Sequence, residues 1–343
     1  LKFGLQRDDV IITKDSEEAE DIAVPSVILD EIKSLVCGYH LAILRPHPDK
    51  IDGKFLMNLL QIFKVNNQFS IRANGITRYG LTRDTIDNVV LSFPSSLKEQ
   101  QKIANILSTL DKTIEKTKEL IEKNQRIKQG LINCLLEPQE DWEEKTLNQI
   151  IKIKHGYAFK GKFFSDQPNN NILLTPGNFA IAGGLYFTKE NTKYYVGTIP
   201  KDFILKNGDL LIVMTDLTKE MNILGNVILL NHNMNILHNQ RIGKIIINND
   251  SKISREFLLY LMNSDYVKKG IKETATGTTV RHTAPSRILC NSVFFPKSLT
   301  EQEKKVSIFS AIDNIISSEK KYLLKLIEIK AGLMNDLLTG EVR

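Results

Sequence analysis

The chain has 343 residues, of which 42% are apolar and 25% charged, and 46 Lys and Arg stand against 40 Asp and Glu. This length accommodates two domains, and no apolar run approaches the roughly 20 residues of a membrane-spanning helix. We therefore expect a soluble, mildly basic, cytoplasmic protein without a membrane partner. Three scattered cysteines, Cys37, Cys134 and Cys290, give no disulfide framework and fit a reducing compartment.

The strongest pattern is an internal repeat with an offset of 202 residues. Residues 89–136 and 291–338 are identical at 20 of 48 positions, where roughly three identities are expected from average composition. Residues 54–60 lie over 256–262 at the same offset, and 27–29 lie over 227–229 at an offset two residues smaller. Because the second unit begins near Trp142, the first lacks an opening stretch of roughly 60 residues, through truncation or natively.

Each unit is predicted to contain a mixed globular part followed by one long helix. We place the first globular part at 1–94 and its helix at 95–138, and the second at 139–296 and 297–343. In the first part, Pro48-Asp49 and Asp52-Gly53-Lys54 spell a compressed nuclease motif. Its two-residue gap cannot spread the carboxylates and the lysine over two strands, so we predict a turn before a helix beginning at Lys54.

A polar loop with one glycine and one arginine follows in the first unit and recurs in the second. Glycine permits a close approach to phosphate, threonine can donate to it, and arginine can bind guanine through two hydrogen bonds. We favour DNA contact over a plain turn because the arginine recurs. The candidate residues are Asn74, Gly75, Thr77, Arg78 and Tyr79, and in the second unit Thr276, Gly277, Thr278, Thr279, Arg281 and His282.

The long helices begin with a capping box, Ser96-x-x-Glu99 and Ser298-x-x-Glu301, and Pro138 and Gly340 lie just beyond their C-terminal ends as stop signals. Their apolar residues alternate by three and four, so the two helices are expected to pack on each other as a coiled coil, and the internal symmetry favours an antiparallel arrangement. The residues that we assign to these subunit-interface helices are Glu99, Gln100, Leu107, Leu110, Ile114 and Ile121, and Glu301, Gln302, Phe309, Ile312, Ile316 and Leu323.

Two further segments of the second unit are candidates for DNA contact. In the first, lysines alternate with aromatic residues; an amphipathic hairpin with solvated lysines and a buried Phe is an equal alternative. In the second, four side chains able to bind base edges precede a strand; a turn that enters the strand is at least as well supported. The candidates are Lys154, Tyr157, Lys160 and Lys162 in the first, and His238, Asn239 and Arg241 in the second.

The second globular part also shows five β-rich runs, beginning at Ile172, Gly208, Asn226, Gly243 and Asn291. We predict a single helix over 254–271. The chain has no phosphate-binding glycine loop and no adenine-methyltransferase tetrapeptide, and its histidines have no partners at metal-ligand spacing. We therefore predict a non-catalytic α+β protein without a metal or cofactor of its own.

The element P-x-x-L-x-E-Q-x-K stands at the start of both long helices, at Pro94–Lys102 and Pro296–Lys304. With W-x-x-K-x-L near 142–147 and the ending LMNDLLTGEVR, it resembles the DNA-specificity subunits of type I restriction–modification systems. The resemblance implies two target-recognition domains of mixed α/β structure separated by two antiparallel coiled-coil helices, in a pseudo-twofold repeat. Each domain would recognise one half of a split site in double-stranded DNA.

The resemblance also implies partners that carry the chemistry. Two modification subunits would bind S-adenosylmethionine and methylate adenine, and restriction subunits would use ATP and Mg²⁺. A first domain without its opening stretch implies recognition of one half-site, or a self-dimer. Two alternatives differ in class: a coiled-coil scaffold, for which the arginine loops are mutationally silent, and the recognition part of a fused methyltransferase–nuclease, whose gene would carry the missing motifs.

Overall fold

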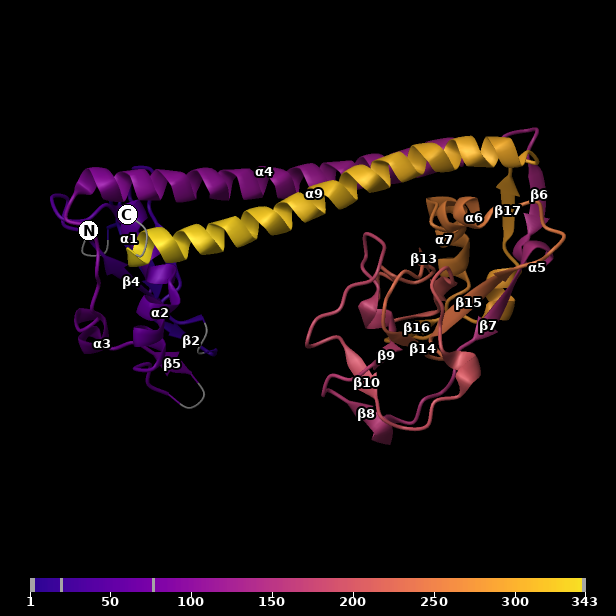
Figure 1. Ribbon diagram of the computed structural model, residues 1–343, viewed down its shortest axis with the longest axis horizontal. Helices are drawn as coiled ribbons and strands as arrows, with labels where there is room; N and C mark the ends of the chain where they lie inside the picture. Colours follow the sequence, from indigo (N-terminus) through magenta and orange to yellow (C-terminus); the bar gives the residue numbers. More distant parts are fainter. Residues whose placement is uncertain (1–3, 19–20, 76–77, 341–343) are drawn as a thin grey trace. The chain divides into compact units, whose positions relative to one another are not determined.

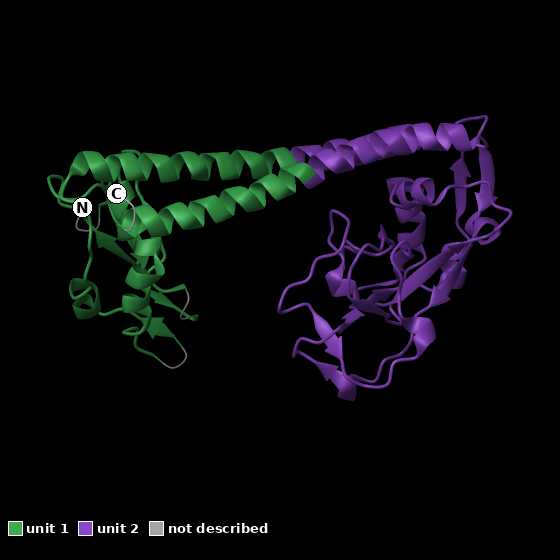
Figure 2. Cartoon of the chain, viewed as in Figure 1, with its two compact units in different colours: residues 1–121, 318–343 green, residues 122–317 purple. Residues whose placement is uncertain are grey.

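The computed structural model describes residues 4–18, 21–75 and 78–340. The chain forms two compact units: unit 1 comprises residues 1–121 and 318–343, and unit 2 comprises residues 122–317 (Figure 2). The division falls within two long helices, α4 (Leu97–Leu135) and α9 (Leu299–Thr339), so each unit contains part of both (Figure 1). Of the helices in the described ranges, none has the length and apolar character to span a membrane.

Unit 1 has a three-stranded antiparallel sheet and a small two-stranded one. The elements are β1 (Val10–Thr13), β2 (Asp15–Ser16), β3 (Pro25–Val27), β4 (Leu41–Leu44), β5 (Tyr79–Gly80), α1 (Gly53–Gln61), α2 (Phe63–Ser70) and α3 (Arg83–Asp87). The larger sheet has the order β3-β1-β4, and β2 pairs with β5. Val10 and Ile12 alternate toward the core, where Phe55 of α1, Leu107 of α4 and Leu338 of α9 meet them.

The start of α1 settles the interpretation of the nuclease-like residues. Asp52 is the N-cap, and its side chain accepts a hydrogen bond from the Phe55 amide at 2.9 Å. An acceptor here satisfies one of the amides that the first helical turn leaves unpaired. The predicted turn before a helix is confirmed, and the helix begins at Gly53, one residue earlier than expected.

Unit 2 contains two four-stranded sheets and two strand pairs. Its elements are β6 (Glu143–Thr146), α5 (Leu147–Ile150), β7 (Ile151–His155), β8 (Phe164–Ser165), β9 (Asn171–Leu174), β10 (Lys193–Tyr195), β11 (Leu210–Val213), β12 (Thr215–Asp216), β13 (Val227–Leu229), β14 (Asn235–His238), β15 (Ile242–Ile247), α6 (Arg255–Met262), α7 (Asp265–Glu273), β16 (Arg281–His282), α8 (Pro285–Leu289) and β17 (Ser292–Phe295). The sheets have the orders β13-β11-β15-β7 and β14-β9-β10-β8, with β12–β16 and β17–β6 as pairs.

The five predicted β-rich runs all contain strands, namely β9, β11, β13, β15 and β17. The single helix predicted over 254–271 is wrong, because α6 ends at Met262 and α7 begins at Asp265. Asn263 interrupts it: the side-chain amide donates to Val227 O at 2.7 Å, and its oxygen accepts from Val227 N at 3.2 Å. These bonds tie the helix end to β13, a long-range contact that local sequence does not reveal.

The amphipathic hairpin considered for the segment of Lys154, Tyr157, Lys160 and Lys162 is also wrong. β7 pairs antiparallel with β15, distant in the chain, with Lys154 opposite Lys244 and Ile151 opposite Ile247. The buried phenylalanine of that alternative is present, since Phe159 is 7% exposed.

The repeat holds in the strand registers, with one correction. Val10 pairs with Val27 and Leu44 in unit 1, and Leu210 pairs with Leu229 and Ile245 in unit 2. Val27 is therefore the counterpart of Leu229, not of Val227 as the sequence match of 27–29 with 227–229 predicted. The sequence Val-Ile-Leu occurs in both units, but its two copies are shifted by two residues relative to the strand pairing. Sequence similarity alone cannot detect this shift, because many aliphatic residues are compatible with a strand and only the pairing fixes their positions.

A buried glutamine attaches each globular part to its long helix. Gln100 donates to Lys50 O at 3.0 Å and Pro94 O at 2.7 Å, and accepts from Asp52 N at 2.9 Å. Gln302 makes the equivalent bonds to Lys252 O at 2.8 Å, Pro296 O at 2.9 Å and Ser254 N at 2.9 Å. Both side chains are 0% exposed. Neither glutamine is available to a partner subunit, contrary to its assignment to a subunit interface, because each one satisfies backbone groups of its own globular part.

Within each unit the two long helices run antiparallel. In unit 1, Lys330 Nζ lies 2.6 Å from an Asp111 carboxylate oxygen; in unit 2, Lys128 Nζ lies 2.6 Å from Asp313. These two ion pairs are equivalent under the 202-residue offset. Six of the predicted apolar interface residues are buried, namely Leu107, Ile114, Ile121, Phe309, Ile312 and Ile316, while Leu110 and Leu323 are half-buried.

Candidate nucleic-acid interface

The glycine loops, defined as residues 74–80 in unit 1 and 276–282 in unit 2, have the same backbone construction. Two backbone hydrogen bonds join Asn74 to Gly80 at 3.0 and 2.9 Å, and two join Thr276 to His282 at 2.9 and 3.0 Å. Each loop then continues into a strand that pairs with a neighbour, β5 with β2 and β16 with β12. The loop is therefore a recurring structural element.

The glycine in each loop is required by the backbone. Gly75 has φ +143° and Gly277 has φ +99°. A Cβ at Gly75 would lie 1.8 Å from Arg78 O, and one at Gly277 would lie 2.1 Å from Val280 O. This close approach within the loop explains both glycines without a phosphate. Thr77 lies outside the described residues.

The two arginines of the loops are not equivalent. Tyr79 lies opposite Ser16, and Arg281 lies opposite Asp216 in the corresponding place. Arg281 therefore corresponds to Tyr79, and Arg78 to Val280. Both loops therefore contain an arginine, which was the reason to favour DNA contact, but the two arginines occupy different positions in the loop.

Arg78 is held by a cluster on the neighbouring strand. Its Nη2 donates to Asp15 Oδ1 at 2.8 Å, and His40 Nδ1 lies 2.6 Å from the same oxygen. Desolvation raises the pKa of Asp15, but the hydrogen bonds from Arg78 and His40 have the larger combined effect, so the pKa of Asp15 lies below its usual value. In unit 2, Thr278, Thr279 and His282 are exposed, and Arg281 Nε is buried without a hydrogen-bond partner among the described residues.

A second loop, residues 217–224, extends directly from β12 and was missed in the sequence. The Asp216 carboxylate, 1% exposed, accepts from Thr218 N and Thr218 Oγ1 at 2.8 Å, from Ile223 N at 2.7 Å and from Leu224 N at 3.2 Å. The loop presents Leu217, 63% exposed, with exposed Thr218 and Lys219. An Asp-x-Thr sequence after a buried strand is the local signal for such a turn.

The lysine-rich segment is largely a packed surface. Lys154 Nζ donates to Asp202 O at 3.2 Å and lies 5.0 Å from the centre of the Phe203 ring. Tyr157 packs edge-on against Phe159, with ring centres 5.0 Å apart. Lys162 lies over the Phe163 ring at 5.0 Å, and Lys160 is exposed. All four lysines of this segment, Lys152, Lys154, Lys160 and Lys162, are exposed, so their ammonium groups are accessible to a phosphate.

Two residues predicted to contact bases are instead structural. His238 is 1% exposed, and its Nε2 lies 2.9 Å from Ile242 O. Asn239 is 9% exposed, and its side-chain oxygen accepts from Arg241 N at 2.9 Å. Neither side chain is available to a base, because His238 is buried at the end of β14 and Asn239 is buried in the turn between β14 and β15. Arg241 is exposed.

The buried imidazole makes the stability of unit 2 depend on pH. Burial lowers the pKa of His238 from 6.5 to about 4, and the charges of Lys244 and Lys154 act in the same direction. The unfolded chain therefore binds this proton more readily than the folded protein. We expect the free energy of unfolding to fall by about 3 kcal/mol as the pH drops from 7 to 4 through this residue alone.

Urea unfolding of the wild type and of His238→Gln from pH 7 to pH 4, followed by the fluorescence of Trp142, measures this contribution. Glutamine can donate to Ile242 O but does not titrate, so the variant should lose less stability toward low pH. His155→Gln, at an exposed histidine, should keep the wild-type slope. Parallel curves for all three proteins would contradict the assignment.

Each long helix has a second, exposed stripe of apolar residues. Its residues mostly precede those of the buried stripe by one position in the sequence, as Ile106 precedes Leu107. On α4 it consists of Ile106, Leu120 and Ile127, which are 45%, 41% and 42% exposed. Their counterparts on α9 under the 202-residue offset, with Ile315 in place of Thr113, are Ile308, Ile315, Tyr322 and Ile329, which are 44%, 49%, 51% and 41% exposed. In unit 1 a groove of about 450 Å³ lies between Leu120 and Tyr322. Such a repeated exposed stripe is typical of a surface that binds another helix.

Comparisons with known proteins agree with the repeat and the fold. The family model of the type I restriction modification DNA specificity domain matches residues 2–126 and 139–328. The specificity subunit of the type I restriction enzyme MjaVIII of Methanocaldococcus jannaschii is 27% identical over 315 residues, covering 85% of this chain and 71% of that protein. A putative MjaX specificity subunit from the same organism is 24% identical over 362 aligned positions, covering 100% and 80%.

Two solved structures share the fold. The S subunit of a type I restriction–modification system from M. genitalium superposes with a TM-score of 0.55 at 19% identity, over 98% of this chain and 84% of that one. A chain from a study of the assembly and conformational transition of the type I R-M system gives a TM-score of 0.58 at 13% identity, over 98% and 83%. With both repeat units matched by the family model, the chain belongs to the family of type I restriction–modification DNA specificity domains.

Proposed function

We propose that this chain is the specificity subunit of a type I restriction–modification complex and that each unit recognises one half of a split site in double-stranded DNA. The observation that supports two half-sites is the recurrence of the glycine loop on an equivalent strand pair, β2–β5 and β12–β16. Unit 2 adds the loop of residues 217–224 beside it. Exposed loops on a rigid strand pair can reach base edges, while nearby lysines contact phosphates.

The DNA-contacting residues that we propose are the exposed ones. In unit 2 the exposed ones are Thr276, Thr278, Thr279, His282, Arg241, Lys160 and Lys162, and in unit 1 they are Asn74 and Arg78. We add the half-buried Arg281 and Tyr79, which lie in the same loops. Thr77, which lies outside the described residues, is kept from the sequence alone. His238 and Asn239 are withdrawn because they are buried. Methyl transfer with S-adenosylmethionine is assigned to modification subunits, and cleavage with ATP and Mg²⁺ to restriction subunits.

The exposed apolar stripe supports two docking surfaces for modification subunits, because it occurs once on each long helix. We expect Ile308→Glu with Ile315→Glu to weaken binding of a modification subunit by about tenfold or more, since two charges would enter an apolar contact. Titration calorimetry with the purified modification subunit measures the change. Ser317→Glu, exposed on the same helix, is the matched control, and an equal loss in that variant would contradict a stripe-specific contact.

Mapping of methylated adenines in cells that co-express this chain and its modification subunit tests the function. Two defined half-motifs separated by an unspecified spacer are the expected result. A palindrome or a single half-motif would restrict recognition to unit 2. A stable complex without methylation or DNA binding would overturn the proposal in favour of a scaffold.

A further inference from the structure

We propose that Leu217, together with Val280, binds the C5 methyl group of a thymine in the half-site of unit 2 and thereby selects that base in the major groove. The inference rests on the proposed function, because it concerns how unit 2 distinguishes its half-site from other DNA. Three observations support it: the register of β12 and β16, the bonds that hold Leu217 in place, and the different side chains at the equivalent positions of unit 1.

Leu217 and Val280 lie across from each other at the end of a strand pair. β12 and β16 are antiparallel, with Asp216 opposite Arg281, and continuing this register by one residue places Leu217 opposite Val280. Because side chains alternate between the two faces of a strand pair, both point away from the face that carries Asp216. Side chains directly opposite on antiparallel strands have Cβ atoms about 4.5–5.5 Å apart, so the two form one apolar surface.

This apolar pair is exposed within a polar surface. Leu217 is 63% and Val280 40% exposed. Their exposed neighbours in the chain, Thr218, Lys219 and Thr279, carry hydroxyl and ammonium groups, which are suited to phosphate oxygens. An apolar pair among such groups faces the base edges when the polar groups contact the backbone. The C5 methyl of thymine is the apolar group that unmodified DNA presents in the major groove.

The backbone beside both apolar residues is held by contacts within unit 2. The Asp216 carboxylate, which directly precedes Leu217, accepts hydrogen bonds from the amide and the hydroxyl of Thr218, both at 2.8 Å. A Cβ at Gly277 would lie 2.1 Å from Val280 O, so the glycine lets the loop fold back closely at that residue. Because the loops are already ordered, an apolar contact with DNA costs little conformational entropy.

The equivalent positions of unit 1 carry different chemistry on the same backbone frame. By register, Leu217 corresponds to Glu17 and Val280 to Arg78, and both residues of unit 1 are exposed. A charged pair is suited to hydrogen-bonding groups on base edges, whereas an apolar pair is suited to a methyl group. A change of side chains on a repeated frame is what the recognition of two different half-sites requires.

Replacement of thymine by uracil tests the contact, because uracil differs from thymine only in lacking the C5 methyl group. The probes are fluorescent duplexes of the mapped target, each with one thymine replaced by uracil, titrated with the complex of this chain and its modification subunit. We expect the wild-type complex to bind about fourfold more weakly when one particular thymine is replaced, the loss that corresponds to one buried methyl group. Because adenine pairs with thymine, each half-site with a methylated adenine offers at least one position.

Two variants assign this loss to Leu217. Leu217→Ala should bind the thymine and uracil duplexes equally at that position. Leu217→Met, which keeps an apolar side chain of similar volume, should retain most of the preference for thymine.

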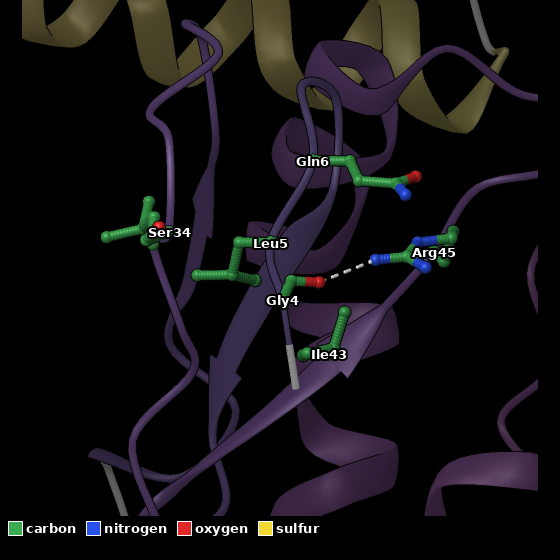
Figure 3. Close-up of a pocket in the computed structure, with 7 residues that line it drawn as sticks. Gly4, Leu5, Gln6, Ser34, Ile43 and Arg45 are labelled. Carbon is green, nitrogen blue, oxygen red and sulfur yellow. Dashed lines mark hydrogen bonds between the residues drawn. The ribbon is translucent and has the colours of Figure 1, made fainter. Parts of the chain in front are cut away.

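Ile246→Ala is the matched control and should keep the wild-type preference. Ile246 is 43% exposed but lies beside the start of β11, whereas Leu217 follows the end of β12. By register its counterpart in unit 1 is Arg45, which lines a pocket and donates from Nη2 to Gly4 O at 3.0 Å (Figure 3). This position therefore lies at the opposite end of the strand from the loops.

The outcomes separate this contact from the proposed function. Equal binding of thymine and uracil duplexes at every position by a wild-type complex that recognises its target would overturn the inference alone, even if Leu217→Ala bound both more weakly, because Leu217 would then contact DNA away from any methyl group. A preference for thymine that persists in Leu217→Ala would overturn it as well, since another residue would bind the methyl group. A wild-type complex without sequence-specific binding would overturn the proposed function and this inference with it.

Discussion

Replacing Gln302 by leucine is expected to lower the free energy of unfolding of unit 2 by about 4 kcal/mol. The leucine fills most of the volume but leaves Ser254 N, Lys252 O and Pro296 O without their partner. A buried backbone group deprived of its hydrogen bond costs about 1–3 kcal/mol, and here three groups are affected at once.

Urea unfolding followed by fluorescence measures this effect well, because Trp142 is the only tryptophan of the chain and packs in the same core as Phe309. Glu303→Leu is the matched control, since Glu303 is the next residue of α9 and is exposed. It should change stability by less than about 0.5 kcal/mol. Similar losses in the two variants would mean that Gln302 owes its burial to packing and not to its hydrogen bonds.

Asp216→Ala is expected to lower stability by about 3 kcal/mol and to weaken binding of the target DNA by about tenfold or more. The carboxylate accepts four hydrogen bonds from Thr218, Ile223 and Leu224, and a charged acceptor makes each of them stronger than a neutral one. Without them the loop of residues 217–224 loses its order, and each contact with DNA must then offset the entropy of ordering it.

Ser16 offers a control within the same chain, because it occupies the equivalent position in unit 1, and among the described residues its hydroxyl accepts from Glu18 N alone, at 3.2 Å. Ser16→Ala should cost less than about 1 kcal/mol. Binding to DNA with the mapped target and to DNA lacking the half-site of unit 2 separates the two roles. Normal binding of the target by folded Asp216→Ala would show that the loop does not contact DNA.

The long helices and the repeat were predictable because the residues that indicate them lie close together in the sequence and occur in both units. The capping residue Ser96 is followed by Glu99 and a three–four apolar spacing, and the Ser96 hydroxyl does accept from the Glu99 amide, at 3.4 Å. The break at Asn263 was not predictable, since it depends on bonds to Val227 in a distant strand. The pairing of β7 with β15 is equally long-range.

The candidate site was predicted in part. The glycine loops were found because a glycine and polar residues recur in both units. That Arg78 and Arg281 occupy different positions was not predictable, because it depends on strand register, and a shift of one residue moves a side chain to the other face of the sheet. His238 and Asn239 have side chains suited to bases, and only their burial reveals a structural role. Gln100 and Gln302 stand in a surface-like sequence, yet they are buried because backbone groups of another segment surround them.

The paired lysine and aspartate of the long helices bear on the ancestry of the chain. Lys128 and Asp111 belong to one repeat unit and Lys330 and Asp313 to the other, and the ion pairs join a lysine of one repeat to the aspartate of the other. Two identical copies of a single unit would form the same two contacts symmetrically. A homodimeric ancestor, duplicated and fused in one gene, could therefore have kept its dimer contacts as intrachain ones while its two recognition surfaces diverged.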